Sequence, residues 1–167
     1  MKPIKIGFGG GCHWCTEAVF SALNGVEKVE QGFIRSLVPN DSYSEAVIVT
    51  FDAETIDLAV LIEIHLRTHA STSDHSMRGK YRSAVYTFDD IQLGASENIL
   101  EQLQNEFDKP IVTAAMPFSQ FKVYDERFQN YYDTDPTRPF CTAYIDPKLK
   151  LLRERFAQNI RTENSTH

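Results

Sequence analysis

Three consecutive glycines that precede Cys12 constrain the fold of this chain more than any other segment. A short apolar stretch leads into them and predicts a strand over 4–10. Apolar side chains then recur at helical spacing, which predicts a helix over 12–24 that ends at Asn24-Gly25. Glycine permits the sharp turn that this change of direction requires. The sequence therefore places Cys12 at the start of a helix, where free N–H groups and the helix dipole favour a thiolate, the reactive form of cysteine.

The remaining periodic segments predict an α+β fold with a split βαβ, ferredoxin-like core and added C-terminal segments. Further strands are expected over 26–33, 46–51, 83–88 and 111–118, of which the second is the clearest central strand and the last, containing Pro117, an edge strand. Further helices are expected from Thr55 to His69, from Asp89 or Asp90 to Phe107, over 124–132, and from Asp146-Pro147 to about Ile160. We expect one domain over 1–167, with a polar tail from about 161.

Composition excludes several classes of protein. The net charge of −6 argues against a nucleic-acid or anionic-membrane ligand. No apolar segment is long enough to span a bilayer, and the N-terminal stretch is too short and too glycine-rich for a signal peptide. Three cysteines, two of them close together, fit a reducing compartment and reactive thiols better than a disulfide scaffold. We therefore expect a cytoplasmic protein.

Cys12 and Cys15 stand at i, i+3 on one helix face, so their sulfurs can approach each other. Such a pair is redox-active, half of a zinc site, or incidental. Zinc needs two further ligands, and Cys141 has no cysteine near it in the sequence, so we expect no metal. His65 and His69 lie one helical turn apart, but we interpret them as the polar edge of a core face rather than as ligands.

Two further side chains are candidates for chemistry beside the thiols. Trp14 is either a core anchor or an apolar wall for a small substrate group. Glu45 heads the strongest predicted strand. If that end of the sheet lies beside the first helix, burial would favour the protonated form of Glu45; otherwise it is a solvated charge.

Four segments in order resemble the A-type peptide methionine sulfoxide reductases. They are GGCHWCTEAVF (10–20), SEAV (44–47), KYRSAVY (80–86) and PFCTAYIDPKL (139–149). The resemblance covers most of the chain. It implies a single catalytic domain that reduces the S epimer of methionine sulfoxide, free or in an oxidised protein, to methionine.

The resemblance also implies the roles of individual residues. Cys12 matches the nucleophile, which becomes a sulfenic acid. Glu45 matches the acid, and Tyr81 matches a tyrosine that helps to bind the sulfoxide oxygen. Cys141 or Cys15 then closes a disulfide, which a thioredoxin-like donor reduces. No cofactor is required.

In the substrate pocket, Trp14 matches a wall of the methyl site, and Asp74 matches a loop aspartate after a change in loop length. Two features depart from the family pattern. His13 replaces the usual phenylalanine and makes one wall polar and titratable. The loop between the second and third strands is largely missing, and we expect Tyr43 to stand in for the tyrosine that it supplies.

The sequence leaves the resolving cysteine open, and we favour Cys141. It lies between Pro139 and Pro147 in a segment without strong periodicity, which predicts that it can move. Cys15 is expected to point along the buried face of its helix.

Two other functions remain as alternatives. One is a general thiol–disulfide oxidoreductase, which would use the C-x-x-C pair and give no task to Glu45 or Tyr81. The other is a non-enzymatic binding protein whose pocket is damaged by the loop loss and by His13. Activity on sulfoxide epimers, compared with activity on a disulfide, separates the three.

Overall fold

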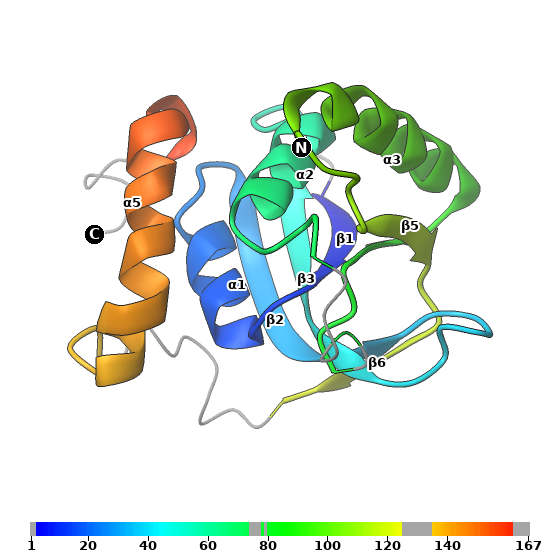
Figure 1. The fold of residues 1–167 in the computed structure, drawn as a ribbon, viewed down its shortest axis with the longest axis horizontal. Coiled ribbons are helices and arrows are strands. Elements are labelled where there is room, and N and C mark those ends of the chain that lie inside the picture. The colour runs from blue at the N-terminus through cyan, green and yellow to red at the C-terminus, as the bar shows by residue number, and fades with distance from the viewer. Residues whose placement is uncertain (1–2, 74–77, 79, 125–134, 162–167) are drawn as a thin grey trace.

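The computed structural model describes residues 3–73, 78, 80–124 and 135–161 and has a mixed α/β architecture (Figure 1). In this part of the chain, six strands form one sheet: β1 (Pro3–Gly9), β2 (Val26–Arg35), β3 (Ser44–Asp52), β4 (Ala84–Thr87), β5 (Ala114–Pro117) and β6 (Gln120–Val123). The main helices are α1 (His13–Ser21), α2 (Leu58–Arg67), α3 (Asp90–Leu103) and α5 (Asp146–Arg155). None of the described helices is long and apolar enough to cross a bilayer.

The strand order is β5-β4-β1-β3-β2-β6. Strand β3 lies between β1 and β2 and is antiparallel to both, so the β-branched run 46–51 occupies the centre of the sheet, as predicted. Strand β5 pairs with β4 in parallel and forms one edge, which confirms the edge position expected for Pro117. Strand β1 pairs with β3 on one side and with β4 on the other, so the segment that leads to Cys12 is fixed along both its edges.

The core follows the two-residue period of the strands. Ile6 and Phe8 of β1 point to the face that α1 and α2 cover, and the Phe8 ring stacks on Phe20 of α1 with centroids 4.6 Å apart. The intervening glycines face the other side of the sheet, where Tyr86 belongs to a smaller apolar cluster. Each fully buried large side chain contributes roughly 1.5–3 kcal/mol to the free energy of folding. These contacts fix α1, and with it the residues at its first turn, against the sheet.

The first helix is shorter than predicted. It ends at Ser21, and the predicted cap at Asn24-Gly25 lies outside it. The Asn24 N–H donates instead to the carbonyl of Asn159, at 2.7 Å, so the chain after α1 bonds to the C-terminal segment rather than to its own helix. Gly25, with φ 94°, lies in the turn that follows.

The other boundaries differ in a similar way. The C-terminal helix ends at Arg155 rather than near Ile160, because Phe156 leaves the helical conformation and buries its ring in the core. The sequence does not predict β6, whose four residues are too few for a visible period; it pairs with the edge of β2. The helix expected over 124–132 falls on residues of which all but the first lie outside the described part.

Candidate active site

The turn between β1 and α1 presents Cys12 at the start of the helix, as predicted. Gly10 has φ 143°, a conformation that favours glycine, and a Cβ there would lie 2.6 Å from the His69 ring. Cys12 is the N-cap residue of α1, with extended backbone angles (φ −60°, ψ 130°), and its thiol is half-buried. Its thiol therefore lies at backbone N–H groups of the first turn, those of Trp14 and Cys15.

These contacts lower the pKa of the Cys12 thiol from its usual value. The main cause is a hydrogen bond from the Cys15 thiol, and the backbone N–H groups of Trp14 and Cys15 act in the same direction. Burial and the nearby Glu45 carboxylate oppose the shift without cancelling it. The local structure thus favours the thiolate form of Cys12.

The other two cysteines lie in one apolar cluster, against which Cys12 packs. Cys15 is buried, as predicted, and its pKa is raised because its proton is bonded to the Cys12 sulfur and because it is desolvated. Cys141 is fully buried, its thiol lies 3.6 Å from the carbonyl of Asp135, and burial raises its pKa. The segment Cys141–Ile145 is a π-helical turn continuous with α5, which corrects the expectation of an irregular segment.

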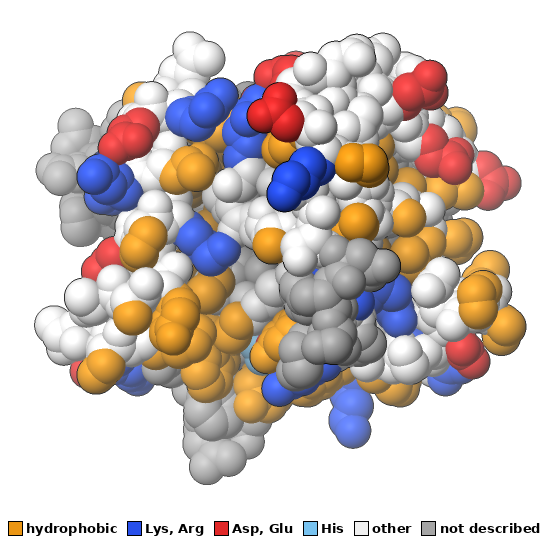
Figure 2. Space-filling model, in the orientation of Figure 1, with side chains coloured by type: hydrophobic (Ala, Val, Ile, Leu, Met, Phe, Trp, Pro, Cys, Tyr) orange, Lys and Arg blue, Asp and Glu red, His pale blue; other side chains and the backbone are white. Residues whose placement is uncertain are grey.

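A cavity of about 370 Å³ opens at the Cys12 sulfur, within the size range of small-molecule sites. Its walls come from the glycine turn, from the loop before β4 and from the C-terminal segment: Gly10, Gly11, Cys12, Cys15, Tyr81, Phe140, Tyr144 and Lys148. On the face shown in Figure 2, hydrophobic side chains gather around the N-terminal end of α5, where the exposed Tyr144 lies. The lining is mostly apolar, which suits a substrate with an alkyl or thioether group.

Lys148 is a cation in this lining that the sequence analysis does not single out. Its ammonium donates to the carbonyl of Thr68, and burial lowers its pKa. Its positive charge interacts electrostatically with the thiols of both Cys12 and Cys15.

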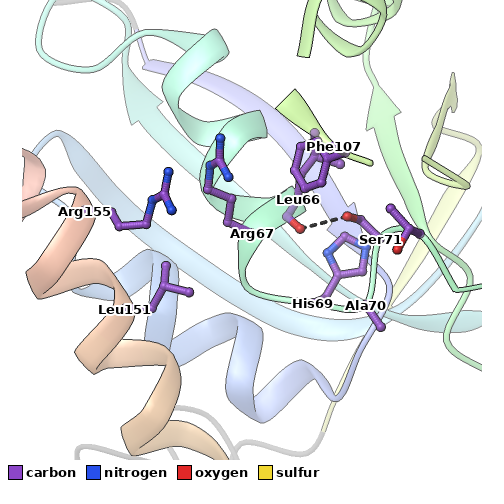
Figure 3. A pocket seen from close by; sticks show the side chains of 9 residues that line it. Leu66, Arg67, His69, Ala70, Ser71, Phe107, Leu151 and Arg155 are labelled. Atoms are coloured by element: carbon purple, nitrogen blue, oxygen red, sulfur yellow. Dashed lines mark hydrogen bonds between the residues drawn. The ribbon is translucent and has the colours of Figure 1, made fainter. Parts of the chain in front are cut away.

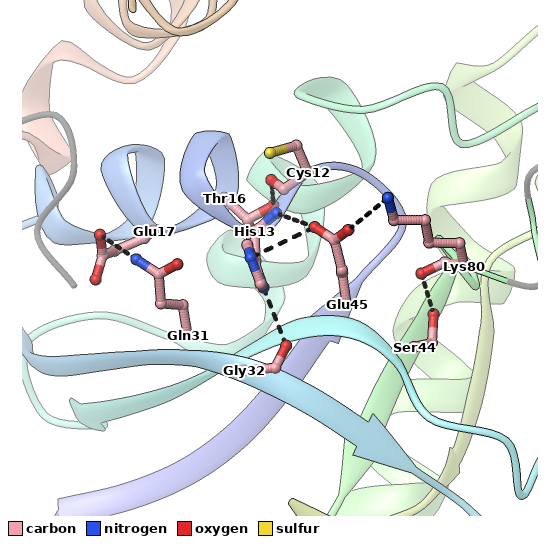
Figure 4. Close-up of polar contacts among 9 residues, drawn as sticks. All are labelled: Cys12, His13, Thr16, Glu17, Gln31, Gly32, Ser44, Glu45 and Lys80. Atoms are coloured by element: carbon pink, nitrogen blue, oxygen red, sulfur yellow. Dashed lines mark hydrogen bonds and ion pairs between the residues drawn. The ribbon is translucent and has the colours of Figure 1, made fainter. Parts of the chain in front are cut away.

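Glu45 lies directly beside the first turn of α1 (Figure 4). One carboxylate oxygen accepts the backbone N–H of His13 at 3.3 Å and faces the Nε2 atom of the same residue at 3.5 Å. The other oxygen lies 3.5 Å from Nζ of Lys80. The side chain is only 8% exposed. Glu45 is therefore a buried carboxyl group next to the thiol, and not a solvated charge at a strand end.

Hydrogen bonds to β3 hold the loop that carries Tyr81. The Glu45 N–H and the Ser44 hydroxyl both donate to the carbonyl of Lys80, at 2.9 and 2.8 Å. Arg78 donates to the carbonyls of Gly10 and Tyr81, both at 2.8 Å, and so ties this loop to the glycine turn. The sequence gives no signal for the role of this arginine, because its acceptors are backbone carbonyls, and Gly10 lies 68 residues away in the chain.

Some residues that the sequence predicts for the pocket lie outside it in the structure. Tyr43 does not line the cavity; it is exposed, and its hydroxyl donates to the side chain of Gln120 in β6 at 3.2 Å. The Trp14 ring packs edge-on against Phe140, which does line the cavity, with centroids 5.3 Å apart. Asp74 lies outside the described residues.

His13 is likewise absent from the cavity lining. It is 3% exposed and packs between the rings of Phe33 and Tyr124, with centroids 5.4 and 4.7 Å away. Its Nδ1 atom lies 3.1 Å from the carbonyl oxygen of Gly32.

His65 and His69 stack on each other with centroids 4.1 Å apart, and burial lowers the pKa of both, that of His69 to about 4. Both are thus neutral core residues at neutral pH, in line with the interpretation from the sequence. Within the described residues, no three His, Cys, Asp or Glu side chains are grouped as a metal site would require.

A second cavity of about 260 Å³ lies between α2 and α5 (Figure 3). No thiol or carboxylate lines it. Arg67 in its wall is already paired with Glu63 at 2.8 Å and Glu106 at 2.7 Å. This second cavity therefore lacks the thiols that line the Cys12 cavity.

Known proteins match this chain over most of its length. Residues 4–160 match the family model described as peptide methionine sulfoxide reductase. The peptide methionine sulfoxide reductase MsrA of Deinococcus radiodurans is 39% identical, over 92% of this chain and 82% of that protein.

Two solved structures of Mxr1 from Saccharomyces cerevisiae have a similar fold. The reduced form has a TM-score of 0.75 and 23% identity over 86% of this chain and 91% of that chain. The form in complex with Trx2 has a TM-score of 0.62 and 24% identity over 78% and 85% of the two chains.

The hydrogen bond from Cys15 to the Cys12 sulfur can be tested directly. Replacing Cys15 with alanine removes the main cause of the lowered pKa of Cys12, so that pKa should rise and less thiolate should be present at pH 7. The rate of alkylation of Cys12 by iodoacetamide, measured against pH with peptide mapping, should move to higher pH. Cys141→Ala is the matched control and should leave the midpoint in place. An unchanged profile in Cys15→Ala would show that the helix N-terminus alone activates Cys12.

Proposed function

The chain belongs to the peptide methionine sulfoxide reductase family, and we propose that it reduces the S epimer of methionine sulfoxide with the Cys12 thiolate as the nucleophile. The protein is an oxidoreductase that acts on methionine sulfoxide. One observation supports the roles below more than any other: the Cys12 sulfur opens into a cavity lined by Tyr81, while the buried Glu45 accepts the backbone N–H of the residue after Cys12.

In the first step, the Cys12 thiolate attacks the sulfoxide sulfur. Glu45 supplies a proton to the sulfoxide oxygen, and the Tyr81 hydroxyl donates a hydrogen bond to it. The attack forms a bond between the two sulfurs. This bond and the S–O bond of the substrate then break as the oxygen passes to the Cys12 sulfur, and the methionine sulfur leaves with an electron pair. Thiolate, sulfoxide and one proton thus become methionine and a cysteine sulfenic acid, so atoms and charge balance.

In the second step, we propose that the Cys141 thiol condenses with the sulfenic acid, releasing water and forming a disulfide. Cys141 and Cys15 belong to the same apolar cluster, against which Cys12 packs, so both candidates lie near the reacting sulfur. We assign Cys15 a different role, the stabilisation of the Cys12 thiolate, because its thiol already donates a hydrogen bond to the Cys12 sulfur. A thioredoxin-like donor then reduces the disulfide, a role supported by the fold shared with Mxr1, which was solved in complex with Trx2.

The substrate contacts are proposed on the same basis. Trp14 packs on Phe140 and would form the apolar wall for the substrate methyl group. Asp74 keeps its proposed role in the loop that precedes Tyr81. Tyr43 would have to leave Gln120 to reach the cavity, so Phe140 and Tyr144 are better candidates for the aromatic walls.

We also propose that residues 1–167 form one catalytic domain that works in the cytoplasm. The order β4-β1-β3-β2 supports a ferredoxin-like core to which β5, β6 and α5 are added.

The two alternative functions are less well supported. A general thiol–disulfide oxidoreductase is not favoured, since that interpretation assigns no role to the buried Glu45 carboxyl group beside the thiol. A binding protein without catalytic activity would not need the lowered pKa of Cys12.

The reaction and its stereochemistry are tested with separated epimers. With dithiothreitol as reductant, the protein should consume the S epimer of methionine sulfoxide and leave the R epimer, and Cys12→Ser should be inactive because a hydroxyl cannot replace the thiolate. Chiral chromatography of the residual sulfoxide gives both rates. Consumption of both epimers at one rate, or full activity of Cys12→Ser, would refute the proposal.

Acid catalysis is tested by Glu45→Gln. The amide keeps the size of the side chain but has no acidic proton to transfer, so kcat should fall by about 10²–10⁴-fold. Glu17→Gln is a matched control: this buried carboxylate of α1 accepts from Gln31 at 3.0 Å, whereas Glu45 accepts the backbone N–H of the residue after Cys12. Near-normal turnover in Glu45→Gln would mean that the proton comes from another group.

The resolving cysteine is tested by one turnover without reductant, followed by peptide mapping. We expect a dominant Cys12–Cys141 disulfide, and loss of thioredoxin-supported cycling in Cys141→Ser, since its sulfenic acid has no designated partner. Dithiothreitol should still support that variant because a small thiol attacks the sulfenic acid itself. A dominant Cys12–Cys15 disulfide would transfer the role to Cys15.

A further inference from the structure

His13, the residue after Cys12, is fixed in one orientation at Glu45. Its Nδ1 atom lies 3.1 Å from the carbonyl oxygen of Gly32. A carbonyl only accepts hydrogen bonds, so Nδ1 carries a proton. The same ring then turns Nε2 towards Glu45, 3.5 Å from Oε1 (Figure 4).

In this orientation, the contact between His13 Nε2 and the Glu45 carboxyl group requires one proton. With Nδ1 protonated, a neutral imidazole has a lone pair at Nε2, and two acceptors would face each other if Glu45 were ionised. The contact is favourable only when a proton lies between them, on the carboxyl group or on the ring. The ring is 3% exposed and packs on Phe33 and Tyr124, surroundings in which an imidazolium ion is costly.

We propose that His13 is a positioning residue that keeps Glu45 protonated by accepting a hydrogen bond from its carboxyl group at Nε2. This inference rests on the proposed function, in which Glu45 gives that proton to the sulfoxide oxygen. The lowered pKa of His13, caused mainly by burial, agrees with a neutral ring.

The other charges around the carboxyl group divide into two sets. Lys80, at 3.5 Å from Oε2, and the His13 backbone N–H favour the carboxylate. The thiolate of Cys12 repels a carboxylate and favours the acid, as does the acceptor Nε2. Tyr124, which packs on the His13 ring, is a further titratable group at this contact. His13 thus offsets Lys80 in an enzyme that needs thiolate and acid at the same time.

The pH dependence of kcat/KM for the S epimer separates this role from a structural one. Activity needs Cys12 ionised and Glu45 protonated, so the profile is bell-shaped and Glu45 sets the alkaline limb. Without the acceptor at Nε2, the proton on the Glu45 carboxyl group has no partner there. In His13→Phe the alkaline limb of the activity profile should therefore move to lower pH. In Lys80→Met it should move up, because a charge that favours the carboxylate is gone.

Two further variants and one spectrum complete the test. His13→Asn keeps an amide donor for the Gly32 carbonyl but has no atom at the Nε2 position. The alkaline limb of its pH profile should therefore move in the same direction as that of His13→Phe. Nitrogen-15 chemical shifts of the His13 ring should show protonated Nδ1 and unprotonated Nε2 between pH 6 and 8, with His13→Phe assigning the signals. This spectrum needs no turnover, so it decides the proposal even if the protein does not reduce methionine sulfoxide. A pH-independent loss of activity in His13→Phe, a shift in that variant but not in His13→Asn, or protonated Nε2 would each overturn it.

Discussion

The antiparallel register of β1 and β3 is the constraint on which the site depends. Gly9, the last residue of β1, pairs with Ala46 near the beginning of β3. Since α1 begins within a few residues of Gly9, the same register brings Glu45 to the first turn of the helix. A shift by one residue would turn Glu45 to the other face of the sheet and bury a carboxyl group there without these partners. The pairing of apolar side chains in the core thus also sets the position of the Glu45 carboxyl group relative to Cys12.

Electrostatic demands at this turn conflict, and the structure balances them with short-range contacts. The N-terminus of α1 and the Cys15 thiol stabilise the Cys12 thiolate. The same N-terminus favours a carboxylate at Glu45, which the proposed reaction needs as an acid. Separate partners for the two groups resolve the conflict: a thiol donor for the sulfur, and a ring acceptor for the carboxyl group. Neither partner could act on both groups, because one donates a proton and the other accepts one.

Much of this arrangement could be predicted from the sequence, since it depends on local patterns. The glycine turn predicts the position of Cys12, and the β-branched run from Ala46 predicts the central strand that carries Glu45. The contributions of Arg78 and Lys148 could not be predicted, because each acts through backbone carbonyls or a cavity wall formed by distant segments. The expected place of Tyr43 was wrong for a related reason: nothing in the local sequence indicates strand β6, which supplies its partner Gln120.

The buried surroundings of the His13 ring constrain both of its nitrogens. Phe33, near the end of β2, and Tyr124, just after β6, pack on the ring of residue 13 and exclude water from it. An imidazole in such surroundings is costly unless both nitrogens have partners, because each unsatisfied buried group costs about 1–3 kcal/mol. The Gly32 carbonyl is an acceptor for Nδ1, and in our proposal the Glu45 carboxyl group is the donor to Nε2. A phenylalanine would fill the same space without this requirement. The histidine is therefore tolerated only while Glu45 carries a proton or shares one with it, so the stability of the buried ring and the protonation of the proposed acid are coupled.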